Sequence, residues 1–328
     1  MHDLYMKSGK EIQLKKFLFN IIGLLLTGAA LYYLGNSFVS GTAEAGGLSN
    51  LLLFDPLLFT VSFILMVLHL LAAAWSWMLV CSVAGAKISF GQAFNVHFLA
   101  QVGKYIPGKV WGAVGKISLS KKLGMSSAVT GHALILETLF IVAGCLLMSL
   151  PVIPLAAKQI GLGTTISVII VVVSVAVVLF AAHPGAFRKL LKIAGSITGR
   201  DFDMDDPGFA NILKLLPVYI LVFLLQGIAF VFLARSFGMH LPFYPGAFLL
   251  PTAVGIGFLA VFSPGGLGIR EISLVWLIGI IMIATEPGQA SLISIAARLW
   301  ITLGEALAFL VAAIWWGAGR KEKGHQIT

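Results

Sequence analysis

The stretch Phe262-Ser-Pro-Gly-Gly-Leu-Gly-Ile-Arg-Glu271 interrupts a long run of apolar residues. It holds a proline and three glycines, followed by an arginine and a glutamate, and apolar sequence continues on both sides. Lipid hydrocarbon offers no hydrogen-bond partner to the backbone, so a break of this kind is tolerated only where protein packs around it or where it lines a wet cavity. The stretch therefore marks a candidate working site.

The composition of the whole chain indicates a polytopic membrane protein. Hydrophobic residues make up 59% of the 328 positions and charged residues 11%, and the mean hydropathy is +1.00, far outside the usual range of soluble domains. The net charge is +9, but the basic residues lie in loops between apolar runs, where membrane orientation explains them without nucleic acid. Cys81 and Cys145 show no ligand-like spacing and no nucleotide motif is present, so we expect no metal and no cofactor.

The apolar runs predict an all-α polytopic membrane protein with about six full transmembrane helices, because each run reaches the roughly 20 residues that a span needs. These helices are expected at 17–39, 57–85, 128–150, 164–182, 212–237 and 290–317. Two further segments, near 88–122 and 244–283, carry Gly/Pro breaks. We expect them to be re-entrant helical hairpins, with paired full spans as the alternative.

A single integral membrane domain is expected over residues 1–328. Its parts are a first helix with an external loop (1–56), repeat one (57–150), helix four with a cytoplasmic loop (151–211), repeat two (212–317) and a basic tail (318–328). Nearly all loop lysines and arginines fall on one side of this arrangement, leaving Lys158, Arg235 and Arg270 at or near the other. The positive-inside rule then places both termini in the cytoplasm, with the chain in a prokaryotic cell (inner) membrane.

The two repeats share the order of their features. Ser89-Phe-Gly-Gln-Ala-Phe94 leads into Lys104-Tyr-Ile-Pro-Gly-Lys109, as Pro242-Phe-Tyr-Pro-Gly-Ala-Phe248 leads into Phe262-Ser-Pro-Gly-Gly266. Counting the membrane crossings along the chain predicts that the two repeats have opposite orientations in the membrane. Interrupted segments at corresponding positions of inverted halves indicate a transporter-type site near the midplane. Two kinked packing helices are the alternative.

Charged residues accompany both breaks and the helices that follow them. The candidate substrate-binding residues are Lys104, Pro107, Gly108, Lys109, Lys116, Glu137, Pro264, Gly265, Gly266, Arg270, Glu271, Arg298 and Glu305. A charge at the bilayer centre costs at least about 2.5 kcal/mol, so each needs a partner or water. We expect the two arginines to pair with Glu137 or Glu305, or to hold an anion together. Ion pairs that only fix the hairpins are the alternative.

Two observations refine this set of polar residues. Basic groups outnumber acidic ones in it, which favours a phosphate-bearing ligand. His69 and His132 lie within predicted spans, and we expect each to form a hydrogen bond between helices. No residue is assigned a catalytic role.

Three blocks of the sequence carry a family resemblance. They are Gly103-Lys-Tyr-Ile-Pro-Gly108 with Lys116 and Lys121-Lys-Leu-Gly124, then Ser263-Pro-Gly-Gly-Leu-Gly-Ile-Arg-Glu271, then Ala296-Ala-Arg-Leu299. Over nearly the full chain, the sequence resembles the transmembrane region of lysylphosphatidylglycerol synthase. In the synthases this region is associated with moving an aminoacylated phospholipid across the bilayer, while a separate soluble domain makes that lipid. The resemblance implies a stand-alone lipid-handling member without that soluble domain and without aminoacyl transfer.

The leading functional hypothesis is a flippase or scramblase-like translocase for a phospholipid or a polyprenyl-phosphate-type lipid. A membrane-embedded transferase with Glu271 or Glu305 as general base is one alternative. The other is an accessory subunit that docks a lipid-synthesis enzyme. A homo-oligomer is a further expected assembly, and enzymatic activity is not expected because no nucleotide motif or soluble catalytic domain is evident.

Overall fold

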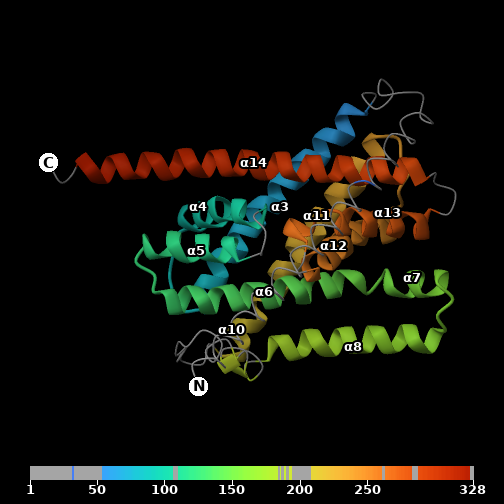
Figure 1. The fold of residues 1–328 in the computed structure, drawn as a ribbon, viewed down its shortest axis with the longest axis horizontal. Coiled ribbons are helices and arrows are strands. Elements are labelled where there is room, and N and C mark those ends of the chain that lie inside the picture. The colour runs from blue at the N-terminus through green and yellow to red at the C-terminus, as the bar shows by residue number, and fades with distance from the viewer. Residues whose placement is uncertain are drawn as a thin grey trace, which may run out of the picture.

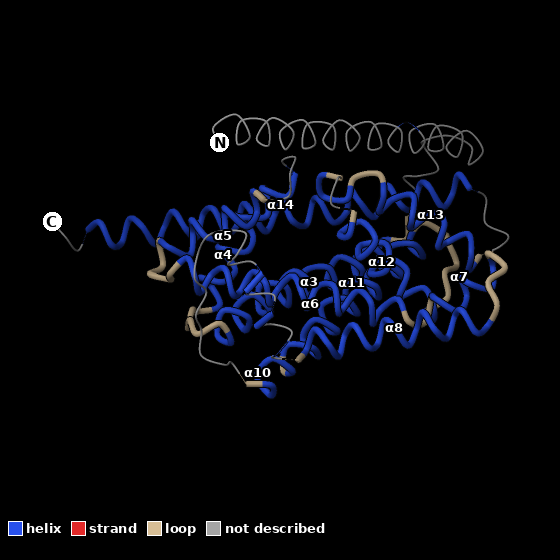
Figure 2. The backbone as a smooth tube through the Cα atoms, turned by 60° about the horizontal axis from the view of Figure 1, so that its bottom comes forward, coloured by secondary structure: helices blue, strands red, loops and turns tan. Residues whose placement is uncertain are grey.

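The structure is a computed structural model that describes residues 32, 54–105, 110–183, 208–260, 263–282 and 287–325, with the single positions 185, 188, 189, 192 and 193. Every regular element in this part of the chain is a helix, and no strand occurs in it (Figure 2). The predicted class of helical membrane protein is confirmed. The helix expected at 17–39 lies outside the described residues.

Four helical segments of the described chain are long and apolar enough to cross a membrane. They are α3 (Pro56–Val83), α6 (Ser127–Ser149), the short α10 (Phe209–Leu213) continued by α11 (Leu215–Ser236), and α14 (Pro287–His325). Each coincides with one of the predicted spans. The span expected at 164–182 is present as the apolar helix α8 (Thr164–Ala182), which the short α7 (Ile153–Gln159) joins to α6. The described residues therefore contain four of the six predicted spans as helices of sufficient length, with α8 as a shorter apolar helix.

Each Gly/Pro break separates two short helices that pack on one another. In the first half, α4 (Phe90–Gln101) leads through η1 (Val102–Tyr105) to α5 (Trp111–Lys121). In the second half, α12 (Phe243–Leu259) leads through η2 (Pro264–Gly266) to α13 (Ile269–Ile281). Figure 1 shows α4 and α5 toward one end of the molecule and α13 toward the other. The expected helix–break–helix order is present in both halves.

The two halves pack with the same pattern of neighbours. Helix α3 contacts α4 and α5 contacts α6, as α11 contacts α12 and α13 contacts α14. Between the halves, α4 packs on α14 and α12 packs on α6, which is the same pairing with the halves exchanged. The order of features read from the sequence therefore corresponds to a repeated packing arrangement.

The first helices of the two halves are antiparallel. Three polar groups, at the start of and along α3, contact backbone carbonyl oxygens of α11. The polar groups are spaced seven residues apart, and so are the carbonyl oxygens, but the two series run in opposite directions along the chain. They are Asp55 N to Ser236 O at 2.8 Å, Ser62 Oγ to Ala229 O at 2.8 Å, and His69 Nδ1 to Val222 O at 2.9 Å. Residues seven apart lie on one helix face, so these bonds fix one register. The halves are thus inverted relative to each other, and the interhelical hydrogen bond expected of His69 is confirmed.

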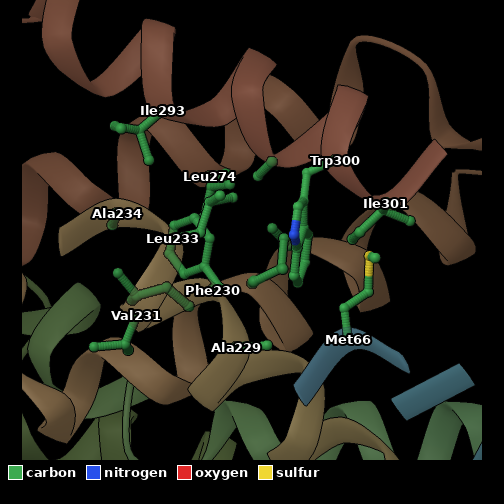
Figure 3. Close-up of a cluster of buried hydrophobic side chains, with 14 of the residues drawn as sticks. Met66, Ala229, Phe230, Val231, Leu233, Ala234, Leu274, Ile293, Trp300 and Ile301 are labelled. Atoms are coloured by element: carbon green, nitrogen blue, oxygen red, sulfur yellow. The ribbon is translucent and has the colours of Figure 1, made fainter. Parts of the chain in front are cut away.

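An apolar cluster joins the two halves at the centre of the bundle. Trp300 of α14, Met66 of α3 and Phe230 of α11 are all buried within it, and Leu274 of α13 packs in the same cluster (Figure 3). In a membrane such contacts stabilise by close van der Waals packing, because lipid is as apolar as the cluster itself. Small residues at helix crossings therefore matter as much as large ones.

Gly227 offers a test of this packing. A Cβ atom added at Gly227 would overlap the carbonyl group of Ala247, where α11 crosses α12. We expect Gly227→Ala to lower the free energy of unfolding by about 1–3 kcal/mol, because the two backbones must separate. Thermal unfolding of the purified protein in detergent measures this change.

The matched control is Gly279→Ala in α13, where no atom lies within 4 Å of the added Cβ. This change should leave stability equal or slightly higher, since alanine favours helix. Equal unfolding temperatures for Gly227→Ala and the wild type would contradict the close crossing.

Candidate functional site

The two breaks meet inside the molecule, where η1 contacts η2. Lys104 lies in η1, within electrostatic range of Arg270, Arg298 and Glu305. His69 of α3 lies within range of the same region. The structure thus brings charged residues of both repeats, predicted from separate stretches of sequence, to one place.

The backbone of the second break requires its glycines. Gly265, Gly266 and Gly268 have φ values of 57°, 69° and 81°, in the left-handed region that side chains disfavour. Gly266 also approaches the backbone of Gly257, whose carbonyl oxygen would lie 3.1 Å from an added Cβ. Ser263 Oγ donates to Leu267 O at 2.7 Å and closes the turn. The Pro-Gly-Gly-Leu-Gly sequence is therefore explained by the local conformation.

Two charged side chains hold this turn against α14. Glu271 Oε2 accepts a hydrogen bond from Gly268 N at 2.7 Å, which caps the start of α13. Arg298 Nη1 donates to Gly265 O at 3.2 Å and to Glu271 Oε1 at 3.3 Å. Arg298 was expected to pair with Glu137 or Glu305, and the structure shows a carboxylate partner that was not expected, Glu271. Glu137 and Glu305 each pair with a lysine of the first half.

An ion pair at the first break connects the two halves. Lys104 Nζ, in η1, donates to Glu305 Oε2, on α14, at 2.5 Å. The break itself is tightly packed, since a Cβ at Gly103 would lie 2.5 Å from Gly112 N of α5. The predicted site residues Pro107, Gly108 and Lys109 lie outside the described residues.

A third ion pair is buried within the first half. Lys116 Nζ, on α5, donates to Glu137 Oε1 and Oε2, on α6, at 2.5 and 2.7 Å. The same ammonium lies 3.4 Å from His97 Nδ1 and 3.8 Å from the centre of the Trp77 ring. These contacts use the three donors of the ammonium group. The pair therefore fixes α5 against α6, and both side chains are buried.

His97 connects this buried pair to the site between the breaks. Its ring lies against Lys116 and within electrostatic range of Lys104 and His69. The sequence makes His97 a weaker candidate for the groove between the hairpins and Trp77 an interfacial anchor. The structure instead buries Trp77 completely, with the Lys116 ammonium over its ring. In the sequence His97 and Trp77 are a polar and an aromatic residue on apolar helices, a pattern that is also typical of ordinary core positions.

The seven charged residues of the described site carry a net charge of one positive. They are Lys104, Lys116, Arg270 and Arg298 with Glu137, Glu271 and Glu305. In the described part of the chain, no three His, Cys, Asp or Glu side chains are grouped as metal ligands. The arrangement is suited to an anion, for which arginine provides paired donors and lysine a point charge.

A small apolar pocket of about 90 Å³ lies between α6 and α12. Its lining includes Val142 and Leu146 of α6 with Gly255, Ile256 and Leu259 of α12. In the same turn of α12, Gly257 packs on the start of α13, at 3.0 Å between an added Cβ and Arg270 Cβ. The end of α12 therefore lines the pocket and also packs on α13.

Comparison with known proteins adds one finding. The family described as "Lysylphosphatidylglycerol synthase TM region" matches residues 20–305, which include both breaks and Arg298 and Glu305 of α14. No curated protein matches the chain.

The buried pair of the first half can be tested by a double-mutant cycle. Removing one partner strands the other charge, so Lys116→Gln and Glu137→Gln should each lower the free energy of unfolding by about 3 kcal/mol. The double change Lys116→Gln with Glu137→Gln should cost less than the two single changes together, because no charge is left uncompensated. Thermal unfolding in detergent gives all three values. Strictly additive costs would argue against the pair.

Proposed function

The chain belongs to the lysylphosphatidylglycerol synthase TM region family, and we propose that it moves a phosphate-bearing lipid across the membrane. Membership supports a membrane protein with a lipid-related function. The flippase or scramblase-like activity and the phosphate are the proposal. The lipid headgroup binds between η1 and η2, while the acyl or prenyl chains stay among apolar side chains.

The observation that carries this proposal is the meeting of the two breaks. Helix interruptions from two inverted halves, packed against each other, are the arrangement that membrane transporters use for substrate sites. Lys104 lies in η1 with Arg270 and Arg298 within its electrostatic range, and Arg298 donates to Gly265 O of η2. A phosphate group there gains charge-assisted hydrogen bonds that lipid hydrocarbon cannot offer.

The apolar pocket between α6 and α12 is suited to part of an acyl or prenyl chain, and it supports a lipid as the source of the phosphate. A free phosphate ion makes no use of such a pocket.

The hairpins are re-entrant in this proposal. Helices α4, α5 and α13 have 12, 11 and 13 residues. At 1.5 Å per residue each is about 20 Å long or less, short of the roughly 30 Å hydrocarbon core. Each hairpin therefore enters from one side, turns at its break and returns, so that the two breaks meet near the midplane.

The transferase alternative receives less support from the site. It needs Glu271 or Glu305 as a general base, and each is engaged in an ion pair. Carboxylate oxygens that already contact a cation are less accessible to a proton of a substrate. We therefore propose transport without covalent chemistry.

Lipid transport can be measured in reconstituted liposomes with a fluorescent phospholipid and a membrane-impermeant quencher. The double change Arg270→Gln with Arg298→Gln removes two donors, each worth about 1.5–3 kcal/mol toward a charged partner. The flip rate should fall by more than about tenfold.

The control for this assay is Arg235→Gln. Arg235, at the end of α11, donates to Leu241 O at 2.8 Å and stacks on Phe243, away from the breaks. It should keep the wild-type rate. A rate unchanged by the double change would refute the proposed site, and no flipping by the wild type with any phospholipid would refute the function.

The proposed orientation, with both termini in the cytoplasm, can be tested by cysteine labelling. Lys158 follows α6 on the external side and Lys121 ends α5 on the cytoplasmic side, and both are exposed. A membrane-impermeant maleimide should label Lys158→Cys in intact cells, and Lys121→Cys only after permeabilisation. The native Cys81 and Cys145 are buried, so background labelling should be low. The reverse pattern would overturn the orientation.

A further inference from the structure

Three lysine or arginine ion pairs described above differ in how open they are. The Lys104 side chain is 32% exposed and that of Glu305 is 15%, whereas no side chain of the other two pairs exceeds 14%. Among these pairs, Lys104–Glu305 is therefore the one that an incoming anion reaches most easily.

This pair also differs in the elements that it joins. Lys116–Glu137 connects α5 to α6 within the first half, and Glu271–Arg298 connects α13 to α14 within the second. Lys104–Glu305 instead connects η1 of the first half to α14 of the second. An anion that replaces Glu305 at Lys104 loosens a contact between the halves.

The chemistry of the two possible partners of Lys104 is alike. A carboxylate and a phosphate both offer charged oxygen acceptors to an ammonium group, and lysine binds each as a point charge. Arg298 on the same helix as Glu305 and Arg270 of α13 lie within electrostatic range of Lys104, and His69 of α3 lies within range of Glu305. A carboxylate displaced from Lys104 therefore stays in a region of positive charge, so displacement does not strand a buried charge.

We propose that Glu305 occupies, in the ligand-free protein, the position at Lys104 that a lipid phosphate takes on binding. This inference rests on the proposed function, since it concerns the same site. It makes Glu305 an internal competitor of the substrate. Removing that competitor should tighten substrate binding, which is the opposite of what a purely structural ion pair predicts.

The test is a binding titration of purified full-length protein in detergent with dioctanoyl phosphatidic acid. Glu305→Gln should lower the apparent Kd by about tenfold, because the fraction of molecules with a free Lys104 rises. Lys104→Gln should raise the Kd by about tenfold, and Lys104→Gln with Glu305→Gln should bind as weakly as Lys104→Gln. A Kd that is unchanged or higher in Glu305→Gln overturns the inference.

A second variant keeps the test usable if Glu305→Gln does not fold. Glu305→Asp shortens the side chain by one methylene and weakens the 2.5 Å contact to Lys104. It should lower the Kd by a smaller factor, and an unchanged Kd counts against the inference.

The matched control is Asp55→Asn, which removes a carboxylate outside the site and keeps the side-chain oxygen that caps α3. It should leave the Kd unchanged. Tightening equal to that of Glu305→Gln would mean that any loss of negative charge suffices, which overturns the specific role of Glu305.

Two further ligands identify the source of the phosphate. Dioctanoylglycerol, which lacks the phosphate, should show no dependence on Glu305. Tightening by Glu305→Gln toward inorganic phosphate but not toward phosphatidic acid would overturn the lipid assignment.

The flip assay separates this inference from the proposed function. If Glu305→Gln binds phosphatidic acid more tightly but the protein does not flip lipids, transport is refuted and the role of Glu305 as an internal competitor is retained. Normal flipping with an unchanged Kd refutes only the competitor.

Discussion

A charge buried in an apolar interior needs a counter-charge, and this requirement determines how both hairpins are held. In each half, the second hairpin helix is joined to the next long helix by one buried pair. Lys116 of α5 pairs with Glu137 of α6, and Glu271 of α13 pairs with Arg298 of α14. The signs are exchanged between the halves, so the electrostatic constraint is kept while the chemistry differs. Breaking either pair strands a charge at a cost of several kcal/mol, which explains why short helices remain in place.

The inverted arrangement depends on a second constraint, the polar stripe on the face of α3 toward α11. The side chains of Ser62 and His69, seven residues apart, and the backbone N–H of Asp55, seven residues before Ser62, are each bonded to the backbone of α11. Such bonds are directional, and in an apolar environment few competing partners exist, so they select one register and an antiparallel direction. Since α3 and α11 open the two repeats, their direction sets that of everything that follows. The two breaks consequently approach from opposite ends and meet.

The sequence predicted the elements better than their contacts. Apolar length alone located α3, α6, α8, α11 and α14, because the roughly 20-residue requirement of a bilayer leaves little choice. The two breaks were equally readable, since Gly265, Gly266 and Gly268 adopt backbone angles that only glycine tolerates readily. The partner of Arg298 was not predicted, because pairing depends on which helix faces touch. The capping role of Glu271 was nevertheless visible in the sequence, because Glu271 lies three residues after Gly268, the spacing of a helix-capping glutamate.

The same need for counter-charges determines how the proposed transport site can be stable when empty and still bind its ligand. A cluster of cations awaiting a phosphate would be costly in a bilayer while empty, and a fully neutralised one would have no affinity when needed. Here each carboxylate of the site lies beside a cation of the site, with one more cation than carboxylate in the described set. Binding an anion then exchanges one set of partners for another and leaves no charge alone. In the proposed mechanism the most exposed exchange is at Lys104, whose pair with Glu305 joins η1 of the first half to α14 of the second, so loading the site would loosen one contact between the halves.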